Sequence, residues 1–398
     1  MAKEQKGQSP FYPGQPVPVD LFVGRSKEIE RIKRAAIQVA AGKPQAVFIT
    51  GEYGIGKSSL ARFVRVVIGD TPGLIGFHVL LGGANSLSDI STATVQTIAS
   101  SSHTKPKMGD KIREALADYI GEQSLFGVFQ LHLDKLRKDA PDIAKGYLPF
   151  LRKIYEQVKD EYKGIVLIFD EINGMASKPS FGTFLKSLVD ENALSDNPLP
   201  LLLILCGTDE RHREIIENHR PVERIFEIAH IDTMSKSEMQ SFFKRTFGKV
   251  DMQVDKDAMS LLCDFSGGFP KLMHLLGDAA FWISEGKSVG ESEAFDAVLA
   301  AAEDVGRKFV DKQVYSALRS KDYRNILNKV GRSGVGVKFK KNEIEKGLNE
   351  DEKKKFNNFL QRMKKLKVIT AGEERGEYVF RDRLTRLYCR MIASKIGR

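Results

Sequence analysis

The sequence predicts an α/β protein in which a helix-covered parallel sheet is followed by a helical lid and a C-terminal winged-helix domain. Three observations predict this class. Short apolar runs alternate with helical patterns as far as residue 232, helical patterns alone occupy 233–303, and the rest of the chain is strongly basic. The length of 398 residues agrees with two or three domains.

The N-terminal residues predict an arm followed by a helix. The first twenty residues hold four prolines and two glycines, which indicates an extended arm over 1–20. Ile29, Ile32, Ala36 and Val39 then repeat at helical spacing, and Gly42 and Pro44 end that pattern.

The parallel sheet is predicted from five short runs rich in Ile, Val, Leu and Phe, at residues 46–50, 76–81, 165–169, 201–205 and 224–231. Continuous apolar runs of this kind are typical of strands that are buried on both faces. A mostly helical stretch covers roughly 87–163. We therefore expect one α/β domain over 21–232.

Residues 233–303 show helical spacing without further strand patterns. Ser235 and Glu238 form a capping box at the start of one helix. Gly267 is expected to end a second helix, and Pro270 to begin a third. This segment is predicted to be a small all-helical lid.

The C-terminal domain, 304–398, is predicted from three helical patterns, two β-prone runs around a glycine-containing turn, and a last helix. Helices followed by a hairpin wing are typical of a winged helix. From Val305 onward the chain holds 26 Lys and Arg against 11 Asp and Glu, a net charge of +15. The whole chain carries +10, so the preceding residues carry −5. A basic module on a mildly acidic body suggests a polyanionic partner.

The composition argues against several classes of protein. The longest apolar stretch ends at Gly207 and is much shorter than the roughly 18 to 20 residues that span a bilayer, and the N-terminus lacks the apolar region of a secretory signal. Cys206, Cys263 and Cys389 are scattered through apolar segments, which predicts buried thiols rather than a disulfide or zinc site. We expect a cytoplasmic protein without a membrane partner.

A phosphate-binding loop is predicted where GEYGIGKS matches the pattern GxxxxGK[ST] between an apolar strand and a helix. The glycines let successive N–H groups face an anion, and the helix N-terminus adds its positive end. Lys57 is expected to reach the β- and γ-phosphates of ATP, and the Ser58 hydroxyl to bind Mg²⁺. The residues expected to contact the nucleotide are Gly51, Glu52, Tyr53, Gly54, Ile55, Gly56, Lys57, Ser58 and Ser59.

Polar residues that follow two later strands predict the second half of this site, because ligands bind at the carboxyl ends of parallel strands. Asp170 is expected at the end of a strand that neighbours the loop strand, where it would hold Mg²⁺ through water. Glu171 is suited to polarise the attacking water as general base. Thr208 follows the run 201–205, where its hydroxyl can orient the water or touch the γ-phosphate.

The motifs FVGR, GEYGIGKS, LIFDE, CGTDE, VERIFEI and SGGFPKLMHLLGDAA, in this order and with a basic winged helix at the end, resemble those of an AAA+ ATPase. Within that family, the chain resembles the origin-recognition initiator-like and archaeal STAND-like groups over nearly its whole length. The resemblance implies an αβα P-loop fold, ATP and Mg²⁺ as cofactors, and hydrolysis of ATP to ADP and phosphate.

The resemblance also assigns residues outside the loop. Phe22, Val23, Gly24 and Arg25 correspond to the segment that packs beside the adenine, and Thr208 to the first sensor. Arg224, or alternatively Arg220, resembles the arginine finger that a neighbouring subunit inserts against the γ-phosphate, which implies self-association into a ring or filament. Lys271 falls where related ATPases carry the second-sensor arginine, although lysine gives a point charge instead of a planar fork.

A basic helix predicted over 353–367 is the candidate contact to double-stranded DNA. Its apolar stripe is expected to face the domain core, and its opposite face to carry Lys354, Lys355, Asn358, Arg362 and Lys365. Basic and amide side chains suit phosphate contacts and groove insertion by a recognition helix. The proposed wing instead holds Glu373, Glu374 and Glu377 beside Arg375, so it would repel phosphates.

Three functions remain open on this evidence. The leading one is an ATP-driven switch that assembles on double-stranded DNA through its winged helix and organises a nucleoprotein assembly. The second is a STAND-like signalling ATPase, for example in defence, whose winged helix docks on a protein effector. The third is a transposition-regulator ATPase that recruits a recombinase, suggested by GGFPK and LLGDAA.

Overall fold

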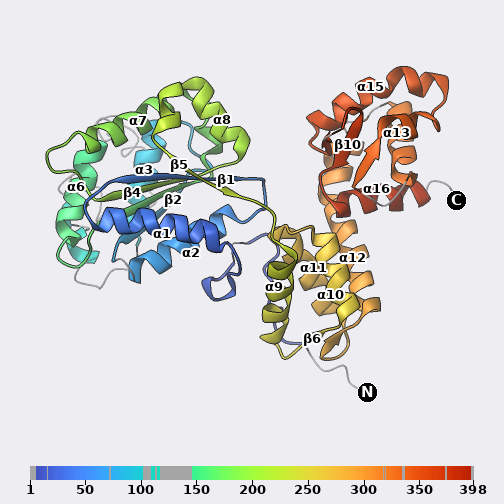
Figure 1. Ribbon diagram of the computed structural model, residues 1–398, viewed down its shortest axis with the longest axis horizontal. Helices are drawn as coiled ribbons and strands as arrows, with labels where there is room; N and C mark the ends of the chain where they lie inside the picture. Colours follow the sequence, from blue (N-terminus) through green and yellow to red (C-terminus); the bar gives the residue numbers. More distant parts are fainter. Residues whose placement is uncertain are drawn as a thin grey trace, which may run out of the picture. The chain divides into compact units, whose positions relative to one another are not determined.

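The computed structural model describes residues 6–15, 17–70, 73–101, 109–112, 114–116, 146–316, 318, 320–333, 337–372 and 374–395 (Figure 1). The chain divides into two units. The α/β unit is Pro16–Asp232, and the C-terminal unit combines Met1–Gln15 with Thr233–Arg398.

The α/β unit is built on a five-stranded parallel sheet, which confirms the predicted fold class. The strands stand in the order β2-β3-β4-β1-β5, and all neighbours pair in parallel. Every residue of β3 and β4 is buried, because helices cover both faces of the sheet. The strand bounds are β1 Gln45–Gly51, β2 Ile75–Leu80, β3 Ile165–Asp170, β4 Leu201–Cys206 and β5 Glu227–Ile231.

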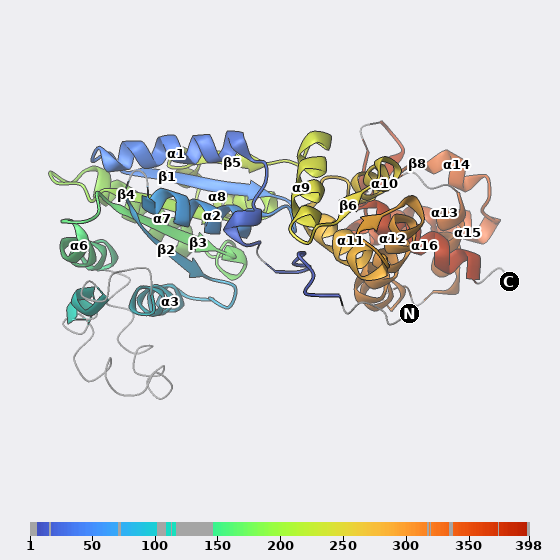
Figure 2. The same cartoon turned by 90° about the horizontal axis from the view of Figure 1, so that it is seen from below.

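The helices of this unit form two layers, one on each side of the sheet (Figure 1), whose strands are seen spread out side by side in Figure 2. On one face, α1 (Ser26–Ala40) packs beside α2 (Lys57–Asp70). The other face contributes a large apolar core with several helices, of which four are named below. The connection from β1 to β2 runs across the sheet in one direction, and the later connections run in the other. Because such connections are right-handed, α2 lies on the face opposite to those four helices. They are α3 (Leu87–Ala99), α6 (Tyr147–Val158), α7 (Pro179–Ala193) and α8 (Asp209–Asn218).

Two details of the α/β unit differ from the prediction, and part of a third prediction lies outside the described residues. β4 lies between β1 and β3, so the prediction that Asp170 follows a strand next to β1 was wrong, because the order of strands along the chain does not set their order in a sheet. The fifth strand begins at Glu227 instead of residue 224, since Arg220–Arg224 form a short 3-10 helix, η4. Within the predicted helical stretch 87–163, residues 102–108, 113 and 117–145 lie outside the described residues.

Within the C-terminal unit, the segment from α9 to α12 overlaps the predicted lid. The capping box of Ser235 and Glu238 is present at the start of α9, and Gly267 ends α10 in a left-handed conformation, as predicted. A short parallel pair, β6 (Gln253–Val254) and β7 (Ser288–Val289), shows that this part is not purely helical. Its helices are α9 (Lys236–Gly248), α10 (Lys256–Ser266), α11 (Pro270–Ile283) and α12 (Glu291–Val305).

Residues 6–15 of the N-terminal arm belong to this unit and pack against these helices. The Phe11 side chain is buried and makes ring contacts with Phe242, Phe247 and His274. Gly277 makes room for it, because a Cβ added there would lie 2.2 Å from the Phe11 ring. The arm therefore completes the core of the lid, and the aromatic pair inside the proline-rich segment was the available signal.

Acid is expected to weaken the packing between arm and lid through His274. Its Nδ1 accepts a hydrogen bond from the Tyr12 backbone N–H at 3.1 Å, and burial lowers the pKa of the imidazole to about 4. The unfolded side chain takes up a proton near pH 6.5, whereas the folded one does not. The free energy of unfolding should therefore fall as the pH drops from about 6.5 towards 4, by about 2 kcal/mol at pH 5.

Denaturant titrations of the wild type and His274→Asn at pH 7 and pH 5 measure this effect. The asparagine carbonyl can accept from Tyr12 in place of Nδ1 and does not titrate. The variant should lose about 2 kcal/mol less than the wild type between the two pH values. Equal losses in the two proteins would show that His274 does not carry the acid sensitivity.

The last part of the chain, here called the C-terminal module, follows α12 through a π-helical segment, η5 (Gly306–Tyr315). The predicted helices and hairpin are present, and a strand that the sequence analysis missed, β8, joins the hairpin in an antiparallel sheet of order β8-β10-β9. The elements are α13 (Lys321–Arg332), β8 (Lys338–Lys340), α14 (Lys341–Glu345), α15 (Glu350–Lys365), β9 (Ile369–Ala371), β10 (Glu377–Phe380) and α16 (Arg383–Lys395).

The three cysteines are buried and free, as predicted. Burial raises the pKa of the Cys389 thiol to about 12, so this residue behaves as a small apolar side chain. Among the described residues, no helix has the length and apolar character needed to cross a membrane.

Candidate nucleotide-binding site

The phosphate-binding loop connects β1 to α2 at the carboxyl edge of the sheet. Gly51, Gly54 and Gly56 have φ angles of 149°, 82° and 103°, which glycine adopts without steric cost. A Cβ added to Gly51 would lie 2.7 Å from the Ile231 carbonyl oxygen, because the end of β5 runs close beside the loop. The course of this loop therefore depends on the glycines of the motif.

Lys57 is the first residue of α2, and its ammonium lies against the loop. The Nζ donates to the carbonyl oxygens of Gly51 at 3.0 Å and Glu52 at 2.7 Å. Desolvation lowers the pKa of this ammonium, although the carboxylates of Asp170 and Asp209 act in the opposite direction. The ammonium is thus a partly desolvated cation, and a bound anion would offset the cost of its desolvation.

The other loop residues differ in exposure. Tyr53 is 69% exposed, whereas the Ile55 side chain is buried. Ser58 and Ser59 lie in the first turn of α2, where free backbone N–H groups favour anions. The Ser59 hydroxyl also accepts a hydrogen bond from the Val17 N–H at 3.3 Å, so it fastens the N-terminal segment to α2.

Asp170 ends β3 with a carboxylate that is only 2% exposed. Its Oδ1 accepts from the Glu171 backbone N–H at 2.9 Å, and its Oδ2 lies 3.0 Å from Nε2 of His78 on β2. Because both oxygens have protein partners, the orientation of the carboxylate is fixed. Sequence reasoning missed His78, although a histidine that interrupts the apolar run of β2 was a signal for it.

Glu171 directly follows Asp170 and is exposed. Its φ of 57° is left-handed, which is uncommon for a residue other than glycine and clusters at functional sites. Its Oε2 would lie 2.4 Å from a Cβ added to Gly82, so that glycine leaves room for the carboxylate. The turn thus presents a second carboxylate beside the buried one.

The residues after β4 come between the loop and the two acids, because β4 lies between β1 and β3. Thr208 caps α8, with its hydroxyl accepting from the Arg211 N–H at 3.3 Å. Asp209 accepts from the Thr50 hydroxyl and lies 3.2 Å from His230 Nδ1. The predicted sensor hydroxyl therefore has a capping role here, and its action on the γ-phosphate stays a prediction.

The segment predicted to pack beside the adenine lies over α2. Phe22 stacks on Phe63 with ring centroids 4.6 Å apart. The buried Arg25 guanidinium donates to the carbonyl oxygen of Ile55 at 3.0 Å and also to that of Asp232. Arg25 therefore ties the phosphate loop to the end of the α/β unit, and a contact of this segment with adenine stays a prediction.

The residues predicted to act on the γ-phosphate from a distance lie on other elements. Arg220 and Arg224 are both on η4, both are exposed, and neither forms an ion pair with a residue in the described ranges. Lys271 is the second residue of α11 in the C-terminal unit, where partial desolvation and Arg381 lower the pKa of its ammonium. The roles of all three as finger or sensor stay predictions.

Mg²⁺, which the resemblance implies, fits the donor chemistry at this edge of the sheet. The ion favours oxygen ligands and is usually held by one or two carboxylates together with substrate phosphates and water. The Ser58 hydroxyl and the Asp170 carboxylate are such donors. No group of three or more His, Cys, Asp or Glu side chains in the described chain could hold a metal.

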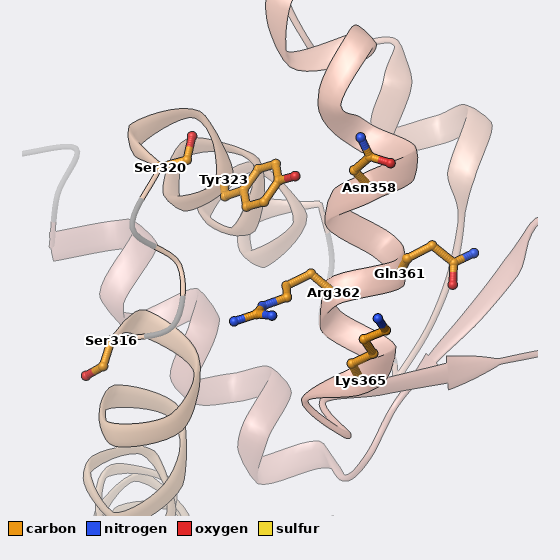
Figure 3. Close-up of a pocket in the computed structure, with 7 residues that line it drawn as sticks. All are labelled: Ser316, Ser320, Tyr323, Asn358, Gln361, Arg362 and Lys365. Atoms are coloured by element: carbon orange, nitrogen blue, oxygen red, sulfur yellow. The ribbon is translucent and has the colours of Figure 1, made fainter.

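The predicted DNA-contact residues fall into two groups along α15. Lys354 lies 3.7 Å from Asp351, and Lys355 pairs with Asp322 of α13, so acids neutralise this half of the helix. The other half forms one side of a polar pocket (Figure 3), lined there by Asn358, Gln361, Arg362 and Lys365.

The hairpin predicted as an acidic wing is partly neutralised. Glu374 pairs with Lys340 at 2.8 Å, and Glu377 lies 3.9 Å from Lys338, both lysines being on the unpredicted strand β8. Glu373 lies outside the described residues. Repulsion of phosphates by this hairpin is therefore weaker than the sequence suggests.

Comparisons with known proteins agree with this geometry. Residues 21–204 match the family model described as AAA ATPase domain. The chain is similar to the ORC2 protein of Aeropyrum pernix, solved as ADPNP-ADP complexes, at 16% identity and a TM-score of 0.58, with 98% of this chain and 97% of that chain covered. It is also similar to a Walker-type ATPase of Pyrococcus abyssi at 15% identity and a TM-score of 0.57, with 93% and 96% covered.

No curated protein sequence matches the chain significantly. At identities near 15%, the likeness to solved structures shows the fold. The family model covers the phosphate loop, the Asp170–Glu171 turn, β1 to β3 and most of β4. Residues 21–204 therefore resemble an AAA ATPase domain, and this part of the chain has the P-loop AAA+ α/β fold.

Proposed function

We propose that this chain hydrolyses ATP to ADP and phosphate with Mg²⁺, and that the bound nucleotide controls its assembly on double-stranded DNA. The observation that carries the proposal is the placement of the Asp170–Glu171 turn at the same sheet edge as the Lys57 loop. That edge supplies a desolvated cation for phosphate, a buried carboxylate for a cation, and an exposed carboxylate for water.

The residues divide the work of phosphoryl transfer to water. Lys57 leaves the carbonyls of Gly51 and Glu52 and pairs with the β- and γ-phosphates. Ser58 and Asp170 would hold a Mg²⁺ ion, which would neutralise charge on the phosphates. Glu171 accepts the proton of the attacking water. The exposed Arg224 or Arg220 of a neighbouring copy completes the site, so ATP favours a ring or filament.

The DNA partner is proposed from the C-terminal module, which we interpret as a winged helix. Its order of helix, strand, two helices and two strands, with a three-stranded antiparallel sheet, supports that interpretation. In it α15 takes the place of the recognition helix. Of the four cations predicted to contact DNA, Lys354 and Lys355 lie near acids, whereas Arg362 and Lys365 form no ion pair with a described residue and are therefore the better placed for phosphate contacts.

Duplex binding by Arg362 and Lys365 is tested with a double variant, Arg362→Gln with Lys365→Gln. Each lost phosphate contact should reduce the slope of log affinity against log salt by about 1. Fluorescence anisotropy of a labelled blunt duplex over a salt series measures both affinity and slope. Lys353→Gln, an ion-paired lysine of the same helix, is the control. An unchanged slope in the double variant argues against α15 as the DNA contact.

A STAND-like signalling ATPase is the second candidate, favoured by the packing of the module on the lid. α16 lies against α12, and a Cβ added to Gly306 would clash with the Tyr388 ring at 2.2 Å. The Tyr388 hydroxyl also donates to Asp311 at 2.8 Å. In this case the module docks on protein, and the wild type shows no salt-sensitive duplex binding with or without ATP.

A further inference from the structure

A pocket of about 630 Å³ lies between α15 and α13, and Ser316 and Ser320 also line it. Figure 3 shows the side chains of Tyr323, from α13, and Arg362, from α15, extending into the space between these two helices. The volume of the pocket lies within the range of about 300 to 1,000 Å³ that is usual for small-ligand sites. The remaining lining residues are also polar: Ser316, Ser320, Asn358, Gln361 and Lys365.

The described residues that line this pocket include two cations and no carboxylate, so their net charge is positive. Neither Arg362 nor Lys365 forms a salt bridge with any residue that the structure describes, whereas Lys353 and Lys355 on the same helix are paired with acids. A paired lysine is already neutralised. Two unpaired cations at a concave polar surface favour an anion, and a guanidinium is especially suited to the oxygens of a phosphate.

Tyr323 adds a feature that a simple anion site does not need. Its ring meets the buried ring of Phe359 with centroids 5.9 Å apart and an interplanar angle of 68°, which holds Tyr323 at the pocket wall. Aromatic rings at such positions stack on bases, and the amides of Asn358 and Gln361 can hydrogen-bond to base edges. Cations, ring and amides together match the phosphate and base of one nucleotide.

A nucleotide within a duplex cannot present all of these parts at once, because its base is stacked and paired. A pocket instead accepts a nucleotide that has left the stack, at a strand end or a bulge. We propose that this pocket binds one unpaired nucleotide of a DNA strand, with its phosphate on Arg362 and Lys365 and its base stacked on Tyr323. This proposal rests on the DNA binding proposed above.

Fluorescence anisotropy with the full chain and three DNAs of one sequence tests the pocket: a blunt duplex, a duplex with a single-stranded overhang, and a duplex with one bulged base. The two DNAs with unpaired bases should bind about tenfold more tightly than the blunt duplex. Tyr323→Ala should remove this preference, and Tyr323→Phe should keep it. Lys353→Gln changes a charge on the same helix outside the pocket and should leave the preference intact.

A second readout does not depend on how the alanine variant folds. With 2-aminopurine at the unpaired position, emission in the wild-type and Tyr323→Phe complexes should drop on binding. Equal affinity of the wild type for all three DNAs, or 2-aminopurine emission that binding does not change, overturns the pocket proposal. In those outcomes salt-sensitive binding to the blunt duplex still supports the proposed function, whereas failure to bind any of the DNAs refutes both.

Discussion

Replacing Glu171 with glutamine is expected to lower kcat for ATP hydrolysis by about 10²–10⁴-fold and to leave the affinity for ATP nearly unchanged. Glutamine keeps the size of the side chain but cannot accept the proton of the attacking water. The Glu171 carboxylate is exposed above Gly82, so the change disturbs no buried contact. Phosphate release at saturating ATP gives kcat, and titration with a fluorescent ATP analogue gives the affinity.

Glu217→Gln is the matched control for this experiment. Glu217 is an exposed residue of α8, and its replacement makes the same change in charge within the same unit. This variant should hydrolyse ATP at the wild-type rate. Wild-type turnover by Glu171→Gln would mean that another group is the general base.

Replacing Lys57 with alanine is expected to abolish measurable ATP binding. Among the described residues, the ammonium donates hydrogen bonds to the loop carbonyls of Gly51 and Glu52, and desolvation lowers its pKa, so pairing with phosphate would offset the cost of its desolvation. The variant keeps the N–H groups of the loop but loses the point charge. Thermal unfolding tests this, because a ligand that binds only the folded protein raises the Tm.

The wild type should gain Tm on addition of ATP with Mg²⁺, and Lys57→Ala should not. Without nucleotide, the variant should unfold at or above the wild-type Tm, because a partly desolvated cation has been removed. Lys43→Ala, an exposed lysine just before β1, should behave as the wild type. A Tm shift with ATP that survives in Lys57→Ala would contradict the assignment.

The phosphate loop and the Asp170–Glu171 turn could be predicted because their signals are local in sequence. A glycine pattern between an apolar run and a helix already contains the backbone geometry, since Gly51, Gly54 and Gly56 adopt angles that other residues avoid. The buried strands could also be predicted, because burial on both faces leaves an uninterrupted apolar run in the sequence.

Contacts between distant segments could not be predicted in the same way. The His78 contact to Asp170 depends on β2 pairing with β3, and the Lys355 contact to Asp322 depends on α15 packing beside α13. Neither partner can be identified from spacing along the chain. The burial of Phe11 was missed for a related reason, since a proline-rich segment gains no regular element and acquires order only from the lid it packs on.

The position of β4 between β1 and β3 sets the width of the nucleotide site by main-chain hydrogen bonds. Two strand spacings, about 10 Å, separate the phosphate loop from Asp170. This separation is fixed by the backbone hydrogen bonds that join β1 to β4 and β4 to β3, and these bonds involve no side chain. Core residues can therefore be exchanged widely without moving Lys57 relative to the acids, which explains how a chain only 16% identical to a protein of known structure shares its fold.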